Sequence, residues 1–409
     1  MIVKKKTNAG HFLYIALAIV ACDFPYSPQP QPDPRGIKAA SRDTGAVGNG
    51  YLYPVNVNQQ TCNPSISQSA AFPACMLWLG FDRVSIHVPD SMSGFSSTPV
   101  KEHDRLTIVD TSNSLRWYMM VSDFSLSGEL QCPEWSTHAG YIACLVGAIS
   151  QPYSGYAVRI GDKKFLKLCD KTLDEFSTPH FWLPDTAVSG GVVSSPVFDA
   201  NGFTQREDVL RFFGTTQFKF VYVVQQDGGT LYYIDYSVSG DPAPAPLQKP
   251  AGKESRYCGS PLISPDGNWV AYHCFPNSSQ GGYYSSYIQR LSPDSKPVFI
   301  ADNASDPHWW ADLYNNNDYY IIYSITKGAY FSEYDFSDRS IENSGAAGAT
   351  VKLRLKGTWK DAPGHVGGLE PDAQLTADTL IRLPFKGGLS RDGYFLCTAY
   401  KYGYIVRLE

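Results

Sequence analysis

The chain has 409 residues with a formal net charge of -5, and 14% of them are aromatic, 18% are charged, 35 are glycine and 28 are proline. Aromatic residues combined with glycine and proline favour strands and turns over helices, so the composition predicts an all-β protein. The acidic balance and the lack of a basic stripe exclude general electrostatic attraction to nucleic acid.

Residues 1–21 have the features of a signal peptide. Three lysines at 4–6 precede an apolar stretch at 12–21 that is too short to span a bilayer. The four residues that end at Cys22 resemble a bacterial lipobox, and this resemblance implies that Cys22 is acylated after cleavage. An ordinary secretory signal or an uncleaved anchor is the alternative. We therefore expect a protein of the cell envelope, attached by lipid to the inner or outer membrane.

Residues 22–50 contain five prolines between positions 25 and 34 and few residues that a core would bury. Proline-rich tethers are semi-extended. This segment is therefore predicted to hold a globular body, residues 51–409, away from the membrane surface.

A sequence motif, which we call the phrase, recurs in residues 51–409. It consists of a proline, an aromatic or aliphatic residue two places on, a polar tight turn and a strand-forming run. The clearest copy is 260–272, and others begin near residues 132, 179, 307 and 387. Glycine at positive φ closes the turn, and proline, which lacks an N–H, suits the entry of a strand. Units of roughly forty to fifty residues predict a β-propeller. With a degenerate first unit, we expect six four-stranded blades.

The predicted strands between the phrases are, in chain order, 81–88, 105–110, 115–121, 141–146, 156–160, 164–168, 218–224, 230–236, 287–291, 319–323 and 404–408. We assign 156–160 to the outer edge of one blade and 164–168 to the inner edge of the next. The copies at Pro179 and Pro196 are too close to belong to separate blades. Choosing the first makes 183–217 an insertion, and a second insertion is expected near 337–372. No segment shows convincing helical periodicity.

Of the nine cysteines, eight remain without Cys22, an even number that suggests disulfides in an exported chain. Cys258 and Cys274 lie almost symmetrically about one hairpin turn, and Cys132 and Cys144 about another, so each pair is predicted to bridge adjacent strands. The other predicted pairs are Cys62 with Cys75 and, by elimination, Cys169 with Cys397. Free buried thiols are the alternative.

The phrase resembles the repeats of TolB-type propellers, in which Pro-x-Trp-Ser-Pro-Asp-Gly precedes a strand. The copy at 260–272 matches well, that at 132 fairly, and the others loosely. Residues 258–409 also resemble a paralogous lipoprotein family of Fibrobacter-type bacteria that has no assigned activity. These resemblances imply the fold and the lipid anchor, and they imply no catalytic residue.

Sequence motifs of three enzyme classes are absent: Gly-x-Ser-x-Gly, His-Glu-x-x-His and the glycine-rich phosphate loop. His180 and His308 hold equivalent positions in two phrases. Some related propellers that act as oligogalacturonate lyases bind a metal through channel histidines, and this resemblance makes the two residues, with His138 and His365, candidate ligands. A packing role is the alternative, and we expect no metal or cofactor.

Aromatic residues provide the last candidates. Trp309, Trp310, Tyr283, Tyr284 and Tyr287 are predicted to contribute to a patch that binds sugar or protein, with at least one of the two tryptophans buried. The preferred function is non-catalytic binding or scaffolding of an envelope protein or polysaccharide through rim loops and insertions. The alternative is a carbohydrate-active enzyme, a polysaccharide lyase or glycoside hydrolase, with its site at the channel mouth.

Overall fold

The computed structural model describes residues 103–126, 128–147, 153–170, 176–224, 227–240, 243–254, 256–274, 284–302, 304–312 and 318–326, together with shorter segments between 37 and 96 and between 348 and 407. For the strands at 37–38, 51–55 and 348–407, the description covers the backbone alone. All of these residues belong to the unit Pro32–Glu409. The predicted signal peptide and Cys22 lie outside them.

The described strands form six antiparallel sheets, five of four strands and one of five. In chain order, four-stranded sheets are β3 (Cys62–Ile66), β4 (Met76–Leu79), β5 (Arg105–Val109) and β6 (Leu115–Met120); β7 (Glu129–Trp135), β8 (Tyr141–Gly147), β9 (Ser154–Arg159) and β10 (Lys164–Lys167); and β11 (Phe176–Trp182), β12 (Lys219–Val224), β13 (Thr230–Asp235) and β14 (Ala245–Pro246). The next two are β15 (Cys258–Ile263), β16 (Trp269–Cys274), β17 (Ser285–Arg290) and β18 (Val298–Asp302); and β19 (Ala304–Asp312), β20 (Asp318–Thr326), β21 (Gly348–Arg354) and β22 (Asp378–Ile381).

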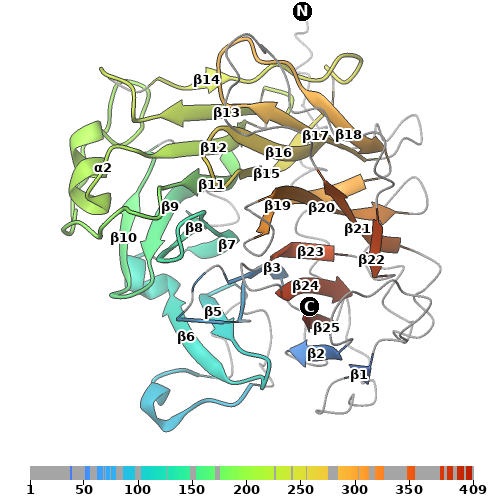
Figure 1. Cartoon of the computed structure of the whole chain (residues 1–409). Coiled ribbons are helices and arrows are strands. Elements are labelled where there is room, and N and C mark those ends of the chain that lie inside the picture. The colour runs from blue at the N-terminus through green and yellow to red at the C-terminus, as the bar shows by residue number, and fades with distance from the viewer. Residues whose placement is uncertain are drawn as a thin grey trace, which may run out of the picture. The chain divides into compact units, whose positions relative to one another are not determined.

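The first strands of successive sheets meet around a common centre. Strand β3 contacts β7, and contacts continue through β11, β15 and β19 to β23 (Phe385–Leu389), which contacts β3 again (Figure 1). Sheets that follow one another radially and close on themselves are the architecture of a β-propeller. The predicted all-β propeller is therefore confirmed.

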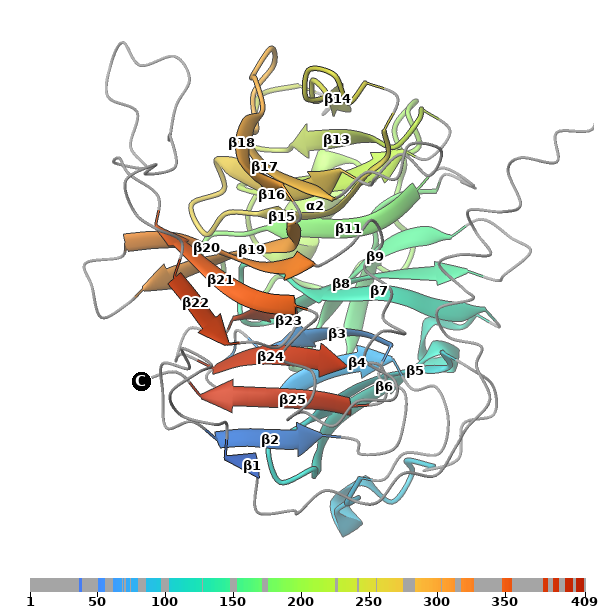
Figure 2. The same ribbon diagram turned by 90° about the vertical axis from the view of Figure 1, so that its right-hand side faces the viewer.

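The five-stranded sheet joins the two ends of the described chain. Its order is β1 (Ile37–Lys38), β2 (Tyr51–Val55), β25 (Tyr402–Arg407), β24 (Tyr394–Ala399) and β23. Figure 2 shows blue β2 beside red β25, and Leu52 is paired with Val406. Backbone hydrogen bonds between distant parts of the sequence thus close the ring. The predicted tether contains β1, so its last part belongs to a sheet.

The structure differs from three other predictions made from the sequence. Residues 164–167 form the outermost strand of the β7 sheet and not the inner strand of the next one. Strand β21 lies within 337–372, so part of that segment is sheet; its Gly and Ala residues hid the alternation of Val351 and Leu353. The insertion at 183–217 contains a helix, α2 (Arg206–Phe213), and two 3₁₀ turns, η1 (Asp90–Met92) and η2 (Val121–Phe124), lie elsewhere. The choice of the copy at Pro179 is confirmed, because β11 contains it.

Both faces of the central strands are buried between neighbouring sheets. On β16, Val270 and Tyr272 pack with Val221 and Val223 of the preceding sheet. The alternate residue Ala271 packs instead with the cluster that contains Ile321 of the following sheet. Successive side chains of a strand point to opposite faces, so two-sided burial requires a continuous apolar run. This explains why all six residues of β16 are buried.

The recurring proline lies in a β-bulge rather than at the entry of a strand. In β7, Gln131 is paired with Leu145 and Glu134 with Ala143, so three steps on β7 correspond to two on β8. The same shift, with proline as its third residue, occurs in β3, β11, β15 and β19. Proline in a bulge interrupts no ladder hydrogen bond. The residue before it has φ of 47° at Cys132, 48° at Ser260 and 47° at Asp306.

Gly267 in the turn between β15 and β16 allows a test of this packing. Its φ is 73°, and a Cβ would lie 2.5 Å from the Trp182 ring of the preceding sheet. Gly252 has nearly the same φ, 74°, with no atom within 4 Å of such a Cβ. We expect Gly252→Ala to cost about 1 kcal/mol through backbone strain. Gly267→Ala is expected to cost about 2–4 kcal/mol, because overpacking adds to the same strain. Urea unfolding measures both, and equal losses would contradict the predicted contact.

Candidate functional site

The bulge places one side chain of each inner strand toward the neighbouring inner strands. The position after the bulge proline is Ser65 in β3, Glu134 in β7, His180 in β11, Leu262 in β15 and His308 in β19. A ring of equivalent residues at the centre of a propeller is the natural place to look for a metal or catalytic site. The contacts of these residues decide which role they have.

Hydrogen bonds connect five inner strands in sequence. The amide N–H of Trp135 donates to Ser65 Oγ over 3.2 Å, and His180 Nε2 donates to the Trp135 carbonyl over 3.0 Å. The amide N–H of Ile263 donates to His180 Nδ1 over 3.0 Å, and Trp309 Nε1 donates to the Leu262 carbonyl over 2.8 Å. These bonds run from β3 through β7, β11 and β15 to β19. We call this set the inner hydrogen-bond chain.

His180 is a structural residue. Both ring nitrogens are used by backbone groups of the two neighbouring sheets, so neither is left to bind a metal. Burial lowers its pKa to about 3, which keeps the ring neutral with Nε2 as donor. These contacts favour the packing alternative for His180 over its role as a candidate metal ligand.

His308 does not complete a metal site with His180. Its Nδ1 lies 2.9 Å from the Asp306 carbonyl oxygen, and burial lowers its pKa. His138 Nδ1 accepts a hydrogen bond from the Gly140 N–H within its own turn, 3.0 Å away, and His365 lies outside the described residues. Among the residues that the structure describes, no group of three or more His, Cys, Asp or Glu side chains is arranged to hold a metal ion.

Trp309 is buried one residue after the bulge position, where Trp135 and Phe181 also enter the core. Trp309 therefore cannot form part of an exposed aromatic patch. Its burial agrees with the prediction that at least one of Trp309 and Trp310 is buried. Tyr287 is buried as well, and Tyr284 packs edge-on against His273, with ring centroids 5.2 Å apart. Tyr283 and the side chain of Trp310 lie outside the described residues. Of the predicted patch, Trp309 and Tyr287 are therefore buried and cannot contribute to an exposed surface.

Glu134 is the chemically unusual residue that the sequence did not reveal. Ser65 Oγ donates a hydrogen bond to Glu134 Oε1. Burial raises the pKa of this carboxyl to about 8, and the negative charge of Asp306 on β19 adds to the effect. A carboxyl that is protonated at neutral pH is a candidate acid in proton transfer. Only its place after the bulge proline distinguished it in the sequence.

The insertion at 183–217 provides a second candidate site, on the outside of the ring. Val209, Phe212 and Phe213 of α2 are buried in the cluster that contains Tyr141 and Phe218. Phe213 stacks on Phe218 with ring centroids 4.7 Å apart. A turn of i, i+3, i+4 apolar residues is too short to stand out in a sequence. The helix is therefore held by core packing, and it fixes the insertion to two sheets.

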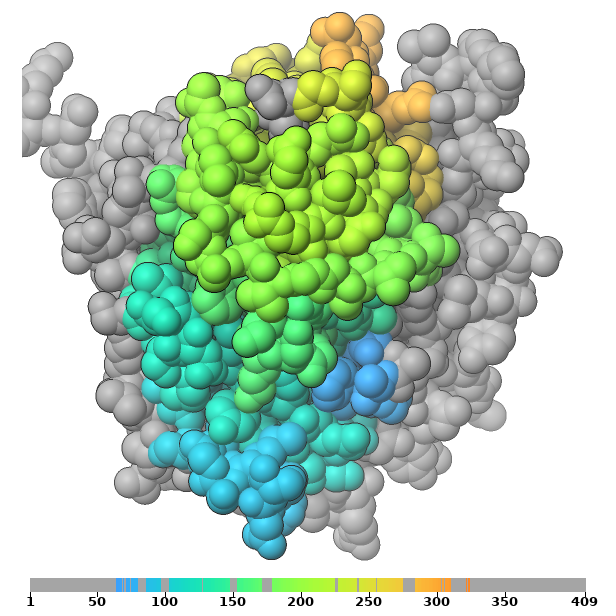
Figure 3. Space-filling view, turned by 90° about the vertical axis from the view of Figure 1, so that its left-hand side faces the viewer, coloured from blue at the N-terminus to red at the C-terminus, as the bar shows by residue number. Residues whose placement is uncertain are grey.

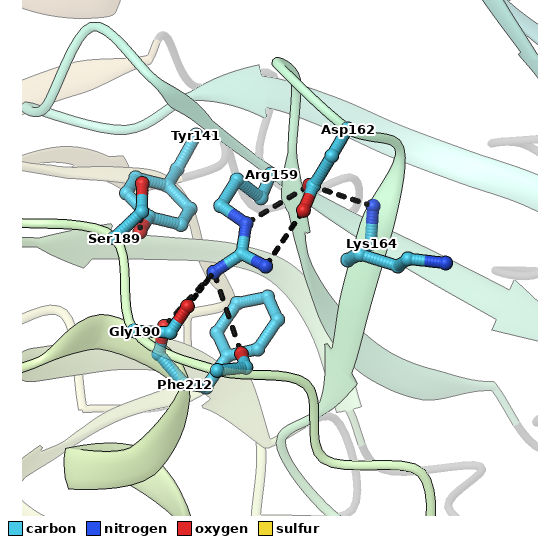
Figure 4. Close-up of polar contacts among 8 residues, drawn as sticks. Tyr141, Arg159, Asp162, Lys164, Ser189, Gly190 and Phe212 are labelled. Atoms are coloured by element: carbon cyan, nitrogen blue, oxygen red, sulfur yellow. Dashed lines mark hydrogen bonds and ion pairs between the residues drawn. The ribbon is translucent and has the colours of Figure 1, made fainter.

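Arg159, at the end of β9, holds the insertion from the neighbouring sheet (Figure 4). Its Nη1 donates to the Gly190 carbonyl over 2.8 Å and to the Phe212 carbonyl over 3.3 Å, and its guanidinium carbon lies 4.9 Å from the centre of the Phe212 ring. Asp162 accepts two hydrogen bonds from the guanidinium, 2.9 and 2.8 Å long, which raises the pKa of Arg159 and lowers that of Asp162. A planar donor satisfies several carbonyls at once.

The insertion exposes four large apolar side chains among polar ones. Val188, Val192, Val197 and Leu210 are exposed, and we call these four residues the valine face. Residues 190 and 191 are hydrogen-bonded to Phe212 and Arg211 at the end of α2, and the Val197 N–H donates to Asp208 of the helix over 2.7 Å. The segments that carry the three valines are thus bonded to α2, and Leu210 lies in this helix. Figure 3 draws this part of the chain in green.

No disulfide joins any two of the six cysteines whose side chains the structure describes, which are Cys75, Cys132, Cys144, Cys169, Cys258 and Cys274. The positions of the cysteines in the fold distinguish the predicted pairs. Cys258 and Cys274 are direct cross-strand partners with sulfur atoms 3.1 Å apart. Cys62 is paired with Leu79, whereas Cys75 lies opposite Ser67, so roughly 16 Å of strand separates them. That exceeds the reach of a disulfide, so the prediction of a bridge between Cys62 and Cys75 is wrong.

The remaining two pairs also lack support in the fold. Cys132 lies in the bulge and packs with the cluster of Ala143 and Leu145, while Cys144 stands between these two on β8 and faces the other side. Cys169 follows β10, and Cys397 lies on β24, with the β3 sheet between their sheets in the ring. The hairpin symmetry of the sequence missed the extra residue that the bulge inserts at Cys132.

No protein-family model matches the chain, and no curated protein matches it in sequence. Among solved structures it is similar to TolB from Acinetobacter baumannii, with 12% identity and a TM-score of 0.37 over 74% of this chain and 59% of that one. It is also similar to the Cps50 (Swd1) β-propeller domain of Myceliophteria thermophila, with 7% identity and a TM-score of 0.34 over 85% and 96%. A third is the GH74 enzyme of Niastella koreensis, with 11% identity and a TM-score of 0.35 over 74% and 45%.

The chain thus spans 59% of TolB, less than two thirds of that protein. Likenesses at these scores support no conclusion about activity, and the fold assignment rests on the sheets themselves. None of the helices in the described part of the chain has the length and apolar character needed to cross a bilayer.

The structural role of His180 predicts a loss of stability on its removal. His180→Ala leaves the Trp135 carbonyl and the Ile263 N–H buried without their partner, which is expected to cost about 2–5 kcal/mol. His87→Ala, at an exposed histidine, is the control and should change stability by less than about 0.5 kcal/mol.

The pH dependence of the same variant checks the assignment. Because the folded protein keeps His180 neutral down to about pH 3, the unfolded chain binds more protons below pH 6.5. The wild type should therefore lose stability relative to His180→Ala as pH falls from 6.5 toward 3. Denaturant unfolding at several pH values measures the difference, and a constant difference would refute the neutral, buried ring.

Proposed function

We propose that this chain is a lipid-anchored protein of the cell envelope whose six-bladed, TolB-type propeller binds a partner without catalysing a reaction. The six antiparallel sheets in the described part of the chain support this number of blades. The anchor is inferred from the pattern that ends at Cys22, and the first part of the predicted tether separates it from the ring.

The valine face is the observation that carries the binding function. Val188 is 75% exposed, and four apolar side chains on one insertion are more than scattered surface residues require. Arg159 and the buried phenylalanines of α2 hold the insertion in place, so little conformational entropy is lost on binding. The described part of the face carries valine and leucine rather than aromatic rings. This favours a protein over a polysaccharide as partner.

A carbohydrate-active enzyme is the second candidate, and Glu134 is the observation that favours it. Its raised pKa and the nearby charge of Asp306 match what an acid and a base of a glycosidase need. However, the same carboxyl accepts a hydrogen bond from Ser65, which belongs to the inner hydrogen-bond chain. This structural engagement leads us to prefer the binding function.

The binding function is tested by removing apolar area from the valine face. The double variant Val192→Ser and Leu210→Ser should keep its stability and lose at least about tenfold in affinity for a partner captured from envelope proteins. Val238→Ser is the matched control, because Val238 and Val192 are both 52% exposed and Val238 lies after β13, outside the insertion. Undiminished binding by the double variant would refute the assignment of this face.

The same envelope location predicts an oxidised pair at Cys258 and Cys274. Their sulfur atoms need to move from 3.1 Å to about 2.05 Å, and thiol–disulfide exchange with an oxidised thiol carrier would remove both thiol protons. Peptide mapping without reduction is expected to recover this one bridge among the described cysteines. Two free thiols in protein isolated from the envelope would contradict it. The N-terminal peptide of the same sample reports whether Cys22 carries acyl chains.

A further inference from the structure

The outermost strand of each sheet has one backbone edge that no other strand of that sheet pairs with, and such edges attract further strands unless they are covered or short. His87 meets the start of β6 at an isolated bridge, and the insertion covers the edge beside β10, where the Thr204 N–H donates to the Leu168 carbonyl over 3.0 Å. Strands β1 and β14 have two residues each, and β22 is described by its backbone alone. Strand β18 has five residues, and no strand or bridge in the described part of the chain pairs with its outer edge.

Strand β18 is also apolar. Its first four residues are Val298, Phe299, Ile300 and Ala301. Phe299 is 49% exposed, and its ring meets that of Tyr287 edge-on with centroids 5.8 Å apart. The other three side chains are partly buried against the cluster that this sheet shares with the next one. An exposed aromatic residue on an uncovered apolar edge marks a place where another strand can pair.

A β-bulge decides what kind of strand fits this edge. Tyr287 is paired with Phe299 and Ser286 with Ala301, so Ile300 is an extra residue on β18. The bulge turns both Ile300 and Ala301 toward the shared cluster and leaves Phe299 on the opposite face. A bulged strand is bent and strongly twisted, so a long, flat peptide follows it poorly. A second copy of β18 has the same bend, and the two edges match.

Opposite charges at the ends of β18 complete the match. Lys296 is exposed two residues before the strand, and Asp302, also exposed, is its last residue. Ser285 Oγ donates to Asp302 Oδ1 over 2.7 Å, which orients the carboxylate at the strand end. Antiparallel pairing of two copies about Phe299 brings Lys296 of each copy beside Asp302 of the other. The edge is therefore complementary to itself in charge as well as in shape.

We propose that two copies of this chain associate through β18, antiparallel about a two-fold axis at Phe299. The two four-stranded sheets then form one continuous sheet, and the Phe299 rings face each other across the axis. Two pairs of Lys296 with Asp302 flank the rings. The valine face lies on the insertion of another sheet, so this proposal does not depend on the proposed partner-binding function.

The strength of the association follows from the size of the contact. One short strand from each copy buries less than the roughly 1,200 Å² of a stable complex, so we expect a reversible dimer with a dissociation constant of about 10–100 µM. Sedimentation velocity of the full chain in detergent measures it. The chain should be monomeric at about 1 µM and mostly dimeric at about 300 µM. A chain that stays monomeric at every concentration overturns the proposal.

Charge exchange tests the antiparallel register. Lys296→Asp and Asp302→Lys each place like charges at both ends of the paired strands, so each variant alone should dimerise at least about tenfold more weakly. An equal mixture of the two variants restores both opposite pairs and should dimerise like the wild type. The double variant in one chain has the wild-type net charge and should also dimerise. If the mixture associates no better than either variant alone, the register is wrong and the proposal falls.

The aromatic contact is tested by Phe299→Lys, which places two cations at the axis and should abolish the dimer. Val238→Ser is the matched control, because Val238 is 52% exposed and lies outside β18. The double variant Val192→Ser and Leu210→Ser should also leave the dimer unchanged, which separates this surface from the valine face. Thermal unfolding shows whether Phe299→Lys folds, and the charge variants decide the matter if it does not. A dimer that survives in folded Phe299→Lys contradicts the proposal.

Discussion

The hydrogen bonds between neighbouring inner strands depend on a β-bulge that five of the six sheets share. Without the extra residue, the side chain after the proline would follow the regular alternation of its strand. With it, Ser65 and His180 meet backbone groups of the next sheet. Three residues before these prolines adopt positive φ, a conformation that costs about 1–3 kcal/mol each in a non-glycine residue. The contacts between sheets offset that cost.

Polar and apolar groups have different roles at the centre and at the outside of the ring. Near the centre, polar groups join neighbouring sheets, and His180 bonds to backbone groups of two of them. At the outside, the insertion places apolar side chains in solvent while its own polar groups are satisfied by Arg159. A rigid ring with exposed apolar groups on a well-anchored insertion is suited to recognition. Glu134 is the exception at the centre, because burial raises the pKa of its carboxyl to about 8.

Much of the fold was predictable from local signals. The phrase at 260–272 combines a tight turn with a two-sided apolar run, and both are properties of a few adjacent residues. The sequence could not show that its proline marks a bulge, because register is set by the partner strand. That omission explains the errors at the cysteines: Cys258 precedes the bulge and stays in register with Cys274, whereas Cys132 lies inside it. Glu134 was missed because burial, which raises its pKa, is a tertiary property.

The sheet that combines β2 with β25 has a consequence for biosynthesis. Residues 402–407 are synthesised long after residues 51–55, so β2 must wait for them before its hydrogen bonds to β25 can form. Until those residues have been made, the edge of β2 that pairs with β25 remains open to other chains, and the β3 sheet lacks its packing against β23 and β24. Such edges invite aggregation. A cell that makes this protein must therefore protect these early strands until residues 402–407 have been synthesised.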